Sequence, residues 1–406
     1  MKVLCFHAMM AMLLAAAGLS AQEPYWPCWR GPNHDGKSTE TGLLKTWPEE
    51  GPPRLWRATG LGKGFSTVAV VGDAIYTAGD VDSDLILVAL DADGQPRWRQ
   101  RVDRAWTDSP PGSRATPTVH GDRVYMLSGH GVLACFEAQQ GRPVWSRDLR
   151  ELGGRPGGWG YAESVLILGN LAIAKPGGEN CIVAFDKSDG QVIWKSAGFR
   201  AGPEYISCVP VSLGRDMLVV TGTSQGLYAV DAKTGRRAWS NDFAAGNTAN
   251  CPDPAYAGGY LFWANGYGKG GICLKLNETE PFAEPRQLYH TQDMDSHHGG
   301  YILHEGYVYG NDGGGFNCLE LSTGKLMWRI REPGKGSLTY ADGMLYLFGE
   351  SGGRAALATC SPQGARITGR VAVEGSGPSW AHPVVAGGRL YLRYDDNLYC
   401  FDVKAR

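Results

Sequence analysis

One pattern recurs at a nearly constant interval along the chain, and it constrains the fold more than any other feature. A small residue, an apolar residue and an acid lead through a short polar stretch to a glycine, and three residues separate that glycine from a tryptophan. Successive tryptophans lie about 45 residues apart, with one gap of about twice that length. The full copies are residues 89–98, 135–145, 184–194, 229–239 and 318–328.

Two weaker copies complete the series. Residues 273–290 fill the long gap, and residues 358–371 follow the last full copy. A period of this length is typical of β-propellers, in which each repeat forms one four-stranded antiparallel blade. Counting the copies, together with a final partial one at the C-terminus, predicts an all-β fold with eight blades.

The residues before each copy alternate between apolar and polar side chains. Residues 116–127, "TPTVHGDRVYML", and residues 382–393, "HPVVAGGRLYLR", show two short apolar runs joined by a turn with glycine. This alternation is typical of antiparallel strands. The last copy has only three such strands, whereas residues 53–60 resemble an isolated fourth strand. We therefore expect the N-terminal strand to complete the last blade, which would leave no open sheet edge.

The repeated aromatic and sulfur side chains have structural explanations. A tryptophan that recurs once per blade is expected to pack between neighbouring blades. Cys135, Cys273, Cys318 and Cys400 occupy a position that is alanine in other copies, which predicts a tight buried site for a free thiol. Cys208 and Cys251 lie near the starts of adjacent blades and are the pair most able to form a disulfide.

The N-terminus has the pattern of a cleaved signal peptide. Lys2 precedes a short apolar stretch, and "LSA" before Gln22 fits a small-residue cleavage site. The predicted organisation is a signal peptide at 1–21, a capping segment rich in Trp, Pro and Gly at 22–52, and a propeller at 53–406. We expect a periplasmic or secreted monomer with no transmembrane segment.

The charge balance argues against a nucleic-acid partner. The chain has 39 Lys and Arg against 41 Asp and Glu, so it lacks the basic excess that binds phosphate backbones.

Polar and aromatic residues recur in the loops that lead from the last strand of one blade to the first strand of the next. In a propeller these loops surround one mouth of the central channel, where a small polar ligand or a partner can bind. The candidate ligand-binding residues are Arg114, Glu163, Asn250, Asp253, His297, His298, Lys335, Trp380 and His382.

The stretch "QDMDSHHGGY", residues 292–301, raises the question of a metal site. Adjacent histidines on a strand point to opposite faces and cannot share an ion, whereas in a loop Asp293, Asp295 and His382 could complete a ligand set. Hydrogen bonding, or one imidazole facing a ligand, is the preferred interpretation, and we predict no metal. The sequence has no nucleophile signature, so no catalytic residue is assigned.

The repeats identify a family resemblance. "GLYAVDAKTGRRAW", residues 226–239, resembles the PQQ-like β-propeller repeat of quinoprotein alcohol dehydrogenases and of the lipoprotein of the outer-membrane β-barrel assembly machinery. The resemblance runs from Pro53 to Lys404. Residues 28–48, 295–310 and 334–351 look like those of a group of exported PQQ-like propellers of planctomycete-type bacteria. This resemblance implies a fold and a family but not an activity.

The resemblance to the dehydrogenases can be carried over only in part. Those enzymes have two adjacent cysteines over the quinone, and this chain has no such pair. Trp380 or Trp159 could stand beneath a quinone, and Glu163, Asn250 and Asp253 are of the residue types that hold calcium. Pyrroloquinoline quinone and calcium are therefore cofactors of an alternative interpretation.

Three functions remain open from the sequence. The first is a non-catalytic exported propeller that binds a partner or a small polar ligand at its channel mouth. The second is a quinone- or metal-dependent periplasmic oxidoreductase. The third is a scaffold in envelope assembly. A shared fold does not choose among them.

Overall fold

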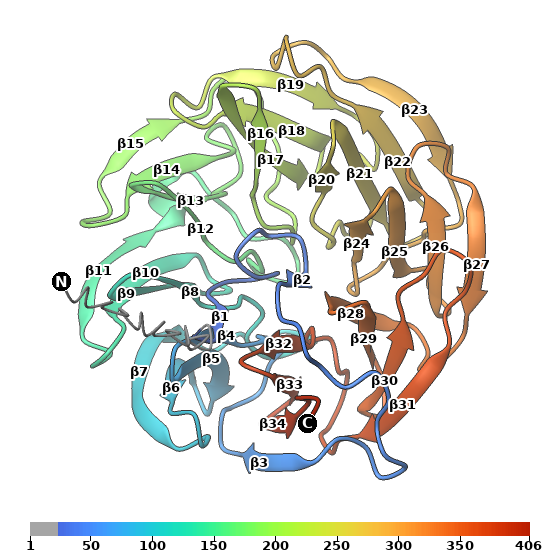
Figure 1. Cartoon of the computed structure of the whole chain (residues 1–406). Helices are drawn as coiled ribbons and strands as arrows, with labels where there is room; N and C mark the ends of the chain where they lie inside the picture. Colours follow the sequence, from blue (N-terminus) through green and yellow to red (C-terminus); the bar gives the residue numbers. More distant parts are fainter. Residues whose placement is uncertain (1–22) are drawn as a thin grey trace, which may run out of the picture.

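The computed structural model describes residues 23–406, which form eight β-sheets arranged as a ring (Figure 1). Each sheet contains four consecutive antiparallel strands, here lettered A to D from the axis outward, except that the last sheet takes its fourth strand from the N-terminal part of the chain. The predicted eight-bladed propeller is confirmed. The predicted signal peptide lies outside the described residues.

Blades 1 to 4 follow one another in chain order. Their strands are β4 (Ala69–Val71), β5 (Ala74–Val81), β6 (Asp84–Leu90) and β7 (Pro96–Arg104); β8 (Thr118–His120), β9 (Arg123–Leu127), β10 (Val132–Glu137) and β11 (Pro143–Asp148); β12 (Leu166–Leu168), β13 (Leu171–Ala174), β14 (Val183–Asp186) and β15 (Val192–Lys195); and β16 (Val209–Leu213), β17 (Asp216–Thr223), β18 (Gly226–Asp231) and β19 (Arg237–Asn241).

Blades 5 to 8 complete the ring. Their strands are β20 (Ala255–Ala257), β21 (Tyr260–Asn265), β22 (Gly270–Lys275) and β23 (Arg286–Thr291); β24 (Tyr301–His304), β25 (Tyr307–Asn311), β26 (Phe316–Glu320) and β27 (Leu326–Ile330); β28 (Gly336–Ala341), β29 (Met344–Gly349), β30 (Arg354–Thr359) and β31 (Ile367–Ala372); and β32 (Val384–Ala386), β33 (Arg389–Tyr394) and β34 (Asn397–Asp402), joined by β3 (Arg54–Ala58).

Helical structure is limited to one 3₁₀ turn, η1 (Leu149–Leu152), within residues 23–406. No helix in this part of the chain has the length and apolar character needed to span a bilayer.

The N-terminal strand closes the ring as the sequence predicts. Strand β3 pairs antiparallel with β34, and Trp56 lies opposite Cys400. The same pairing of the repeat aromatic with the Ala/Cys position occurs between Trp145 and Cys135 in blade 2. Because the register is shared, β3 takes the place of strand D in blade 8 and removes the sheet edge that β34 would otherwise expose.

The repeated tryptophans join each blade to the next one. The indole N–H of Trp145 donates to the Lys187 carbonyl at 3.0 Å, and that of Trp194 donates to the Ala232 carbonyl at 3.1 Å. The Trp194 ring lies so close to Gly235 of the following blade that an added Cβ would approach it to 2.4 Å. The predicted packing between blades is confirmed, and it explains the glycine of the repeat as well as the tryptophan.

The weak copy at residues 273–290 keeps this contact with a different side chain. Tyr289 lies opposite Cys273, in the register that tryptophan occupies elsewhere. Its hydroxyl donates to the Leu321 carbonyl at 2.9 Å, and its ring covers Gly324. A tyrosine therefore replaces the tryptophan without loss of the contact between blades.

All cysteines within residues 23–406 are free thiols. The disulfide considered for Cys208 and Cys251 is not formed. The four thiols at the Ala/Cys repeat position are fully buried in the blade cores, as predicted.

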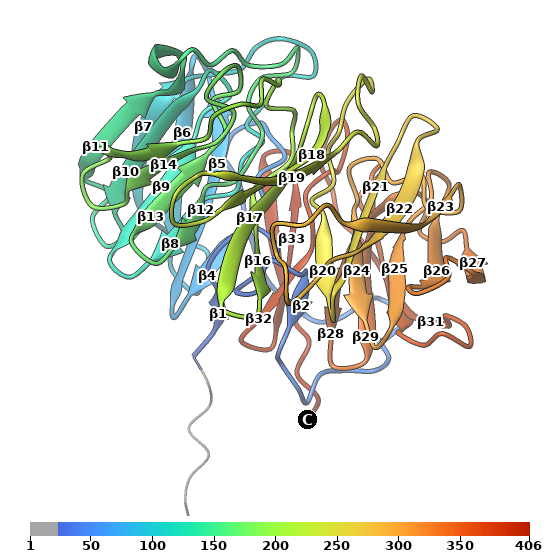
Figure 2. The same ribbon diagram turned by 90° about the horizontal axis from the view of Figure 1, so that it is seen from above.

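The segment before β3 contributes to the centre of the ring. Strand β1 (Tyr25–Trp26) pairs antiparallel with β4, and β2 (Lys37–Ser38) pairs parallel with β28. Both partners are innermost strands, so the segment between β1 and β2 lies near the axis (Figure 1). The chain then reaches the outer part of blade 7, where Trp47 packs on Gly369. Figure 2 shows this later stretch on the same face of the ring as the C-terminus.

Candidate functional site

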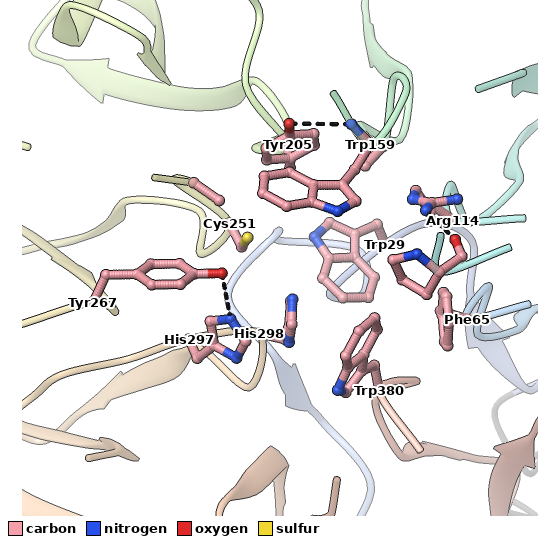
Figure 3. A pocket seen from close by; sticks show the side chains of 13 residues that line it. Trp29, Phe65, Arg114, Trp159, Tyr205, Cys251, Tyr267, His297, His298 and Trp380 are labelled. Atoms are coloured by element: carbon pink, nitrogen blue, oxygen red, sulfur yellow. Dashed lines mark hydrogen bonds between the residues drawn. The ribbon is translucent and has the colours of Figure 1, made fainter. Parts of the chain in front are cut away.

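A cavity of about 330 Å³ lies where the D-to-A loops meet around the axis. Every blade except the seventh contributes a residue from the loop before its A strand, and the N-terminal segment adds Trp29 (Figure 3). The lining residues are Trp29, Phe65, Pro110, Arg114, Trp159, Ala162, Tyr205, Ala249, Cys251, Tyr267, His297, His298 and Trp380.

Aromatic rings form most of the cavity wall. Trp380 packs between two neighbours, with ring centroids 4.6 Å from Phe65 and 4.1 Å from His298. On another side Trp159 meets Tyr205 edge to face at 5.7 Å. Rings that already pack on one another lose little freedom when a ligand binds, so such a wall suits a flat apolar body.

Arg114 supplies a permanent positive charge to this wall. Its guanidinium donates to the carbonyls of Gly112 at 2.5 Å and Pro110 at 2.6 Å, and it lies over the rings of Phe65 and Trp106. It forms no ion pair with a carboxylate of residues 23–406. Burial lowers the pKa of Arg114 to about 10, so the side chain remains a cation at neutral pH.

His297 belongs to a hydrogen-bonded cluster beside the cavity. The His297 Nε2 lies 2.9 Å from the Tyr267 hydroxyl (Figure 3). Its Nδ1 lies 2.9 Å from the Lys335 ammonium. Lys335 also pairs with Glu350 at 3.0 Å. Burial alone would raise the pKa of Glu350, but the contacts with His297 and Lys335 outweigh it and hold the pKa below its usual value.

Both histidines lie in the loop before β24, so strand alternation does not separate them. Their ring centroids are 3.6 Å apart. Burial, reinforced by neighbouring cations, lowers the pKa of His298 well below its usual value. The acids considered as further metal ligands point elsewhere, because Asp293 pairs with Arg329 and Asp295 accepts from the Gly268 N–H.

Four of the predicted site residues lie behind the cavity wall instead of lining it. Asp253 accepts from the Trp29 indole at 2.7 Å and from the Ser207 N–H at 2.8 Å. His382 packs on Trp29 at 4.5 Å and contacts the His298 carbonyl at 3.1 Å. Asn250 donates to two buried carbonyls. These side chains position the residues that face the cavity.

Glu163 is the fourth buried residue. Its Oε1 accepts from the Lys175 N–H at 2.6 Å, whereas its Oε2 has no hydrogen-bond partner. Burial raises the pKa of Glu163 to about 7. The buried Lys175 ammonium, which donates to the carbonyls of Pro203 and Gly222, compensates part of this cost.

The calcium ligands implied by the resemblance do not fit an ion here. The oxygens of Asp253 and Asn250 already accept hydrogen bonds from within the protein, and only one oxygen of Glu163 is free. A calcium site needs six or more converging oxygens. The three residues therefore serve the loop structure, and no chemical step is assigned to calcium.

Sequence reasoning predicted the ring of loops but missed contributors from outside these loops. Trp29 precedes the first blade and has no repeat register. Tyr267 lies in the turn between β21 and β22, and Glu350 follows β29, so neither belongs to a D-to-A loop. Of the predicted residues, Arg114, His297, His298 and Trp380 line the cavity, and Lys335 contacts it through His297.

Comparison with known proteins places these features in context. The family model described as outer membrane protein assembly factor BamB matches residues 49–195 and 83–330, which is more than half of the chain. The outer membrane protein assembly factor BamB of Shewanella oneidensis is 25% identical over 249 residues, or 58% of this chain and 61% of the relative. The chain thus spans less than two thirds of the length of that relative.

Two solved structures share the propeller. BamB from Moraxella catarrhalis has a TM-score of 0.62 and 15% identity, and the match covers 86% of this chain and 99% of that one. Quinohemoprotein alcohol dehydrogenase from Comamonas testosteroni has a TM-score of 0.67 and 13% identity, with 95% and 82% covered. At these identities the likeness shows the fold alone.

Proposed function

The chain belongs to the family described as outer membrane protein assembly factor BamB, a family of PQQ-like propellers, and from this premise we propose that it binds a small planar anion at its axial mouth. The observation that carries the proposal is the Arg114 guanidinium, which faces an aromatic cavity and has no carboxylate partner within residues 23–406. The proposal thus specifies a flat shape and a negative charge for the small polar ligand expected from the sequence.

The residues of the cavity wall suit both the flat apolar body and the anionic group of such a ligand. The rings of Phe65, Trp159 and Trp380 offer flat surfaces to an apolar body, and the cavity volume is at the lower end of that of small-molecule sites. A carboxylate or similar group would pair with the Arg114 fork, which suits planar oxyanions. A charge-assisted hydrogen bond would stabilise the complex more than a neutral one.

Binding without turnover is favoured by the state of the reactive side chains. Burial raises the pKa of the Cys251 thiol to about 12, so this cavity residue stays protonated and is a poor nucleophile. The His297 Nδ1 is already bound to an ammonium group. These contacts leave the cavity with shape and charge but without an activated nucleophile.

A matched pair of probes tests the proposal. Indole-3-acetate and indole-3-acetamide have the same flat body and differ in charge, and calorimetric titration measures the affinity of each. We expect the acetate to bind at least tenfold more tightly, and Arg114→Gln to abolish this preference. Trp380→Ala should weaken both probes. Arg101→Gln, which removes an exposed arginine paired with Asp84, is the control. Equal binding of the two probes, or no binding, would overturn the proposal.

Family membership favours a second candidate, a role in outer-membrane protein assembly. The support is the name of the matched family and of the Shewanella oneidensis relative, of which this chain spans 61%. A pull-down from envelope extracts distinguishes the two functions. Recovery of outer-membrane assembly components would favour the scaffold function if substitutions on the protein surface abolish it and Arg114→Gln does not.

The oxidoreductase alternative is tested by reconstitution with pyrroloquinoline quinone and calcium. Stoichiometric retention of the quinone together with oxidation of an alcohol would replace the binding function.

We also propose that residues 1–21 are removed during export to a periplasmic or secreted location. N-terminal sequencing of the mature protein would show Gln22 as the first residue, whereas an intact Met1 would contradict export by cleavage.

A further inference from the structure

Three potential metal ligands converge at the edge of the cavity. His297 and His298 precede β24, and Glu350 follows β29, so two neighbouring blades supply the set. One nitrogen from each imidazole and one carboxylate oxygen all lie within 4.8 Å of one another. Two imidazoles and a carboxylate are a ligand set that proteins use for zinc.

Two of these groups have polar atoms that lack partners. The His298 Nδ1 and the Glu350 Oε2 are buried, and neither forms a hydrogen bond in this structure. A buried polar atom without a partner costs roughly 1–3 kcal/mol, so such atoms persist in proteins when something else binds them. Both atoms belong to residues of the converging set, which gives independent support for a cation site.

A cation already occupies this position in part. The Lys335 ammonium lies between the His297 Nδ1 at 2.9 Å and the Glu350 Oε1 at 3.0 Å. The Glu350 carboxylate and the His297 imidazole therefore both direct lone pairs toward the Lys335 ammonium. The Lys335 side chain is partly exposed and flexible, so it can withdraw to solvent when another cation takes its place.

We propose that His297, His298 and Glu350 bind a divalent transition-metal ion such as Zn²⁺, in competition with the Lys335 ammonium. Both imidazoles line the cavity, so the fourth position of a tetrahedral ion would be open toward it. From the sequence we predicted no metal because nothing fixed the geometry of the paired histidines, and Glu350 was not considered because it belongs to a different blade. The site goes beyond the proposed ligand function, and the metal alone is sufficient to test it.

The test is calorimetric titration of the metal-free protein with ZnCl₂, supported by the visible absorption spectrum of the Co²⁺ form. We expect one equivalent to bind. Glu350→Gln and His298→Ala should each weaken binding at least tenfold, and Lys335→Met should strengthen it by a similar factor because the competing cation is removed. The effect of Lys335→Met distinguishes a metal site from a structural hydrogen-bonded cluster, in which this change would bring no gain.

Surface histidines can bind zinc adventitiously, so His120→Ala serves as the control. It removes an exposed histidine on strand β8 and should leave the affinity unchanged. Circular dichroism confirms that each variant is folded, and the isosteric Glu350→Gln keeps the test valid if His298→Ala does not fold. Absence of zinc binding, an equal loss in His120→Ala, or weaker binding in Lys335→Met would each overturn the metal site. Loss of indole-3-acetate binding alone would overturn only the proposed ligand function.

Discussion

The outer rim and the inner mouth of the ring use the repeat in opposite ways. At the rim, strand D repeats one contact, in which an aromatic ring covers a glycine of the next blade and donates to one of its carbonyls. At the mouth, equivalent loop positions hold different residues, namely Phe65, Arg114, Ala162, Cys251, His298 and Trp380. Uniform residues therefore maintain the ring, and varied residues create a shaped cavity at its axis.

The two regions also treat buried polar groups differently. At the rim, five of the repeat indoles donate to a carbonyl of the next blade, namely those of Trp56, Trp98, Trp145, Trp194 and Trp328. At or behind the mouth, Glu163, His298 and Glu350 keep buried polar atoms without partners. Unpartnered buried polar atoms lower stability and are common at binding sites, so they agree with the proposed binding function of the mouth.

Truncation of a rim tryptophan should produce the largest loss of stability. Trp194→Ala removes a buried ring and its hydrogen bond to the next blade, and we expect a loss of about 3–5 kcal/mol in the free energy of unfolding. Chemical denaturation measures this change. Binding of indole-3-acetate by the remaining folded protein should be unchanged. A loss below about 1 kcal/mol would show that the rim contact does not hold the ring together.

The buried carboxyl behind the mouth should respond to pH. The folded pKa of Glu163, about 7, lies above the value of 4.5 for an exposed glutamate, so its contribution to stability is present at low pH and is lost as the pH rises through 7. Glu163→Gln should therefore stabilise the protein at pH 8 by up to roughly 3 kcal/mol relative to its effect at pH 4. The control is Glu151→Gln, an exposed carboxyl in η1. Equal effects at both pH values would contradict the assignment.

The glycine under each rim ring can be tested against a matched glycine. Gly235 and Gly246 both have positive φ, at 71° and 64°, so alanine strains the backbone similarly at each. Only at Gly235 would the added Cβ meet the Trp194 ring, whereas Gly246 has open space. We expect Gly235→Ala to cost about 2 kcal/mol more than Gly246→Ala in thermal unfolding. Equal costs would mean that backbone strain alone explains the repeat glycine.

The paired histidines of the mouth should matter least for stability. Replacing both His297 and His298 with alanine removes contacts to Tyr267 and Lys335 but leaves the blades intact, so we expect a change below about 1 kcal/mol. Thermal unfolding at pH 7 checks this. A loss above about 3 kcal/mol would make the pair a structural element of the ring and would remove the contrast between rim and mouth.

The sequence was most informative where geometry repeats. The Trp–Gly copies predicted the blades, the packing between them and the closure by residues 53–60, because one physical contact recurs in each blade. The D-to-A register likewise brought Arg114, His298 and Trp380 to one cavity.

Features that depend on single contacts were not predictable. Trp29 reaches the cavity because β1 and β2 pair with the inner strands of blades 1 and 7, and no repeat marks such a segment. Glu163, Asn250, Asp253 and His382 have polar side chains typical of a site, yet their hydrogen bonds place them behind the wall. Whether a loop residue faces the cavity or supports it depends on side-chain packing, which the register does not specify.

A crystal structure of the protein soaked with indole-3-acetate tests the division between rim and mouth most directly. The expected result is density in the axial cavity, with the ring against Trp380 and the carboxylate within hydrogen-bonding distance of Arg114. A second cavity is lined by Arg354 and Arg370 of blade 7. Density only in that cavity, or an empty axial cavity at saturating ligand, would contradict a binding site at the mouth.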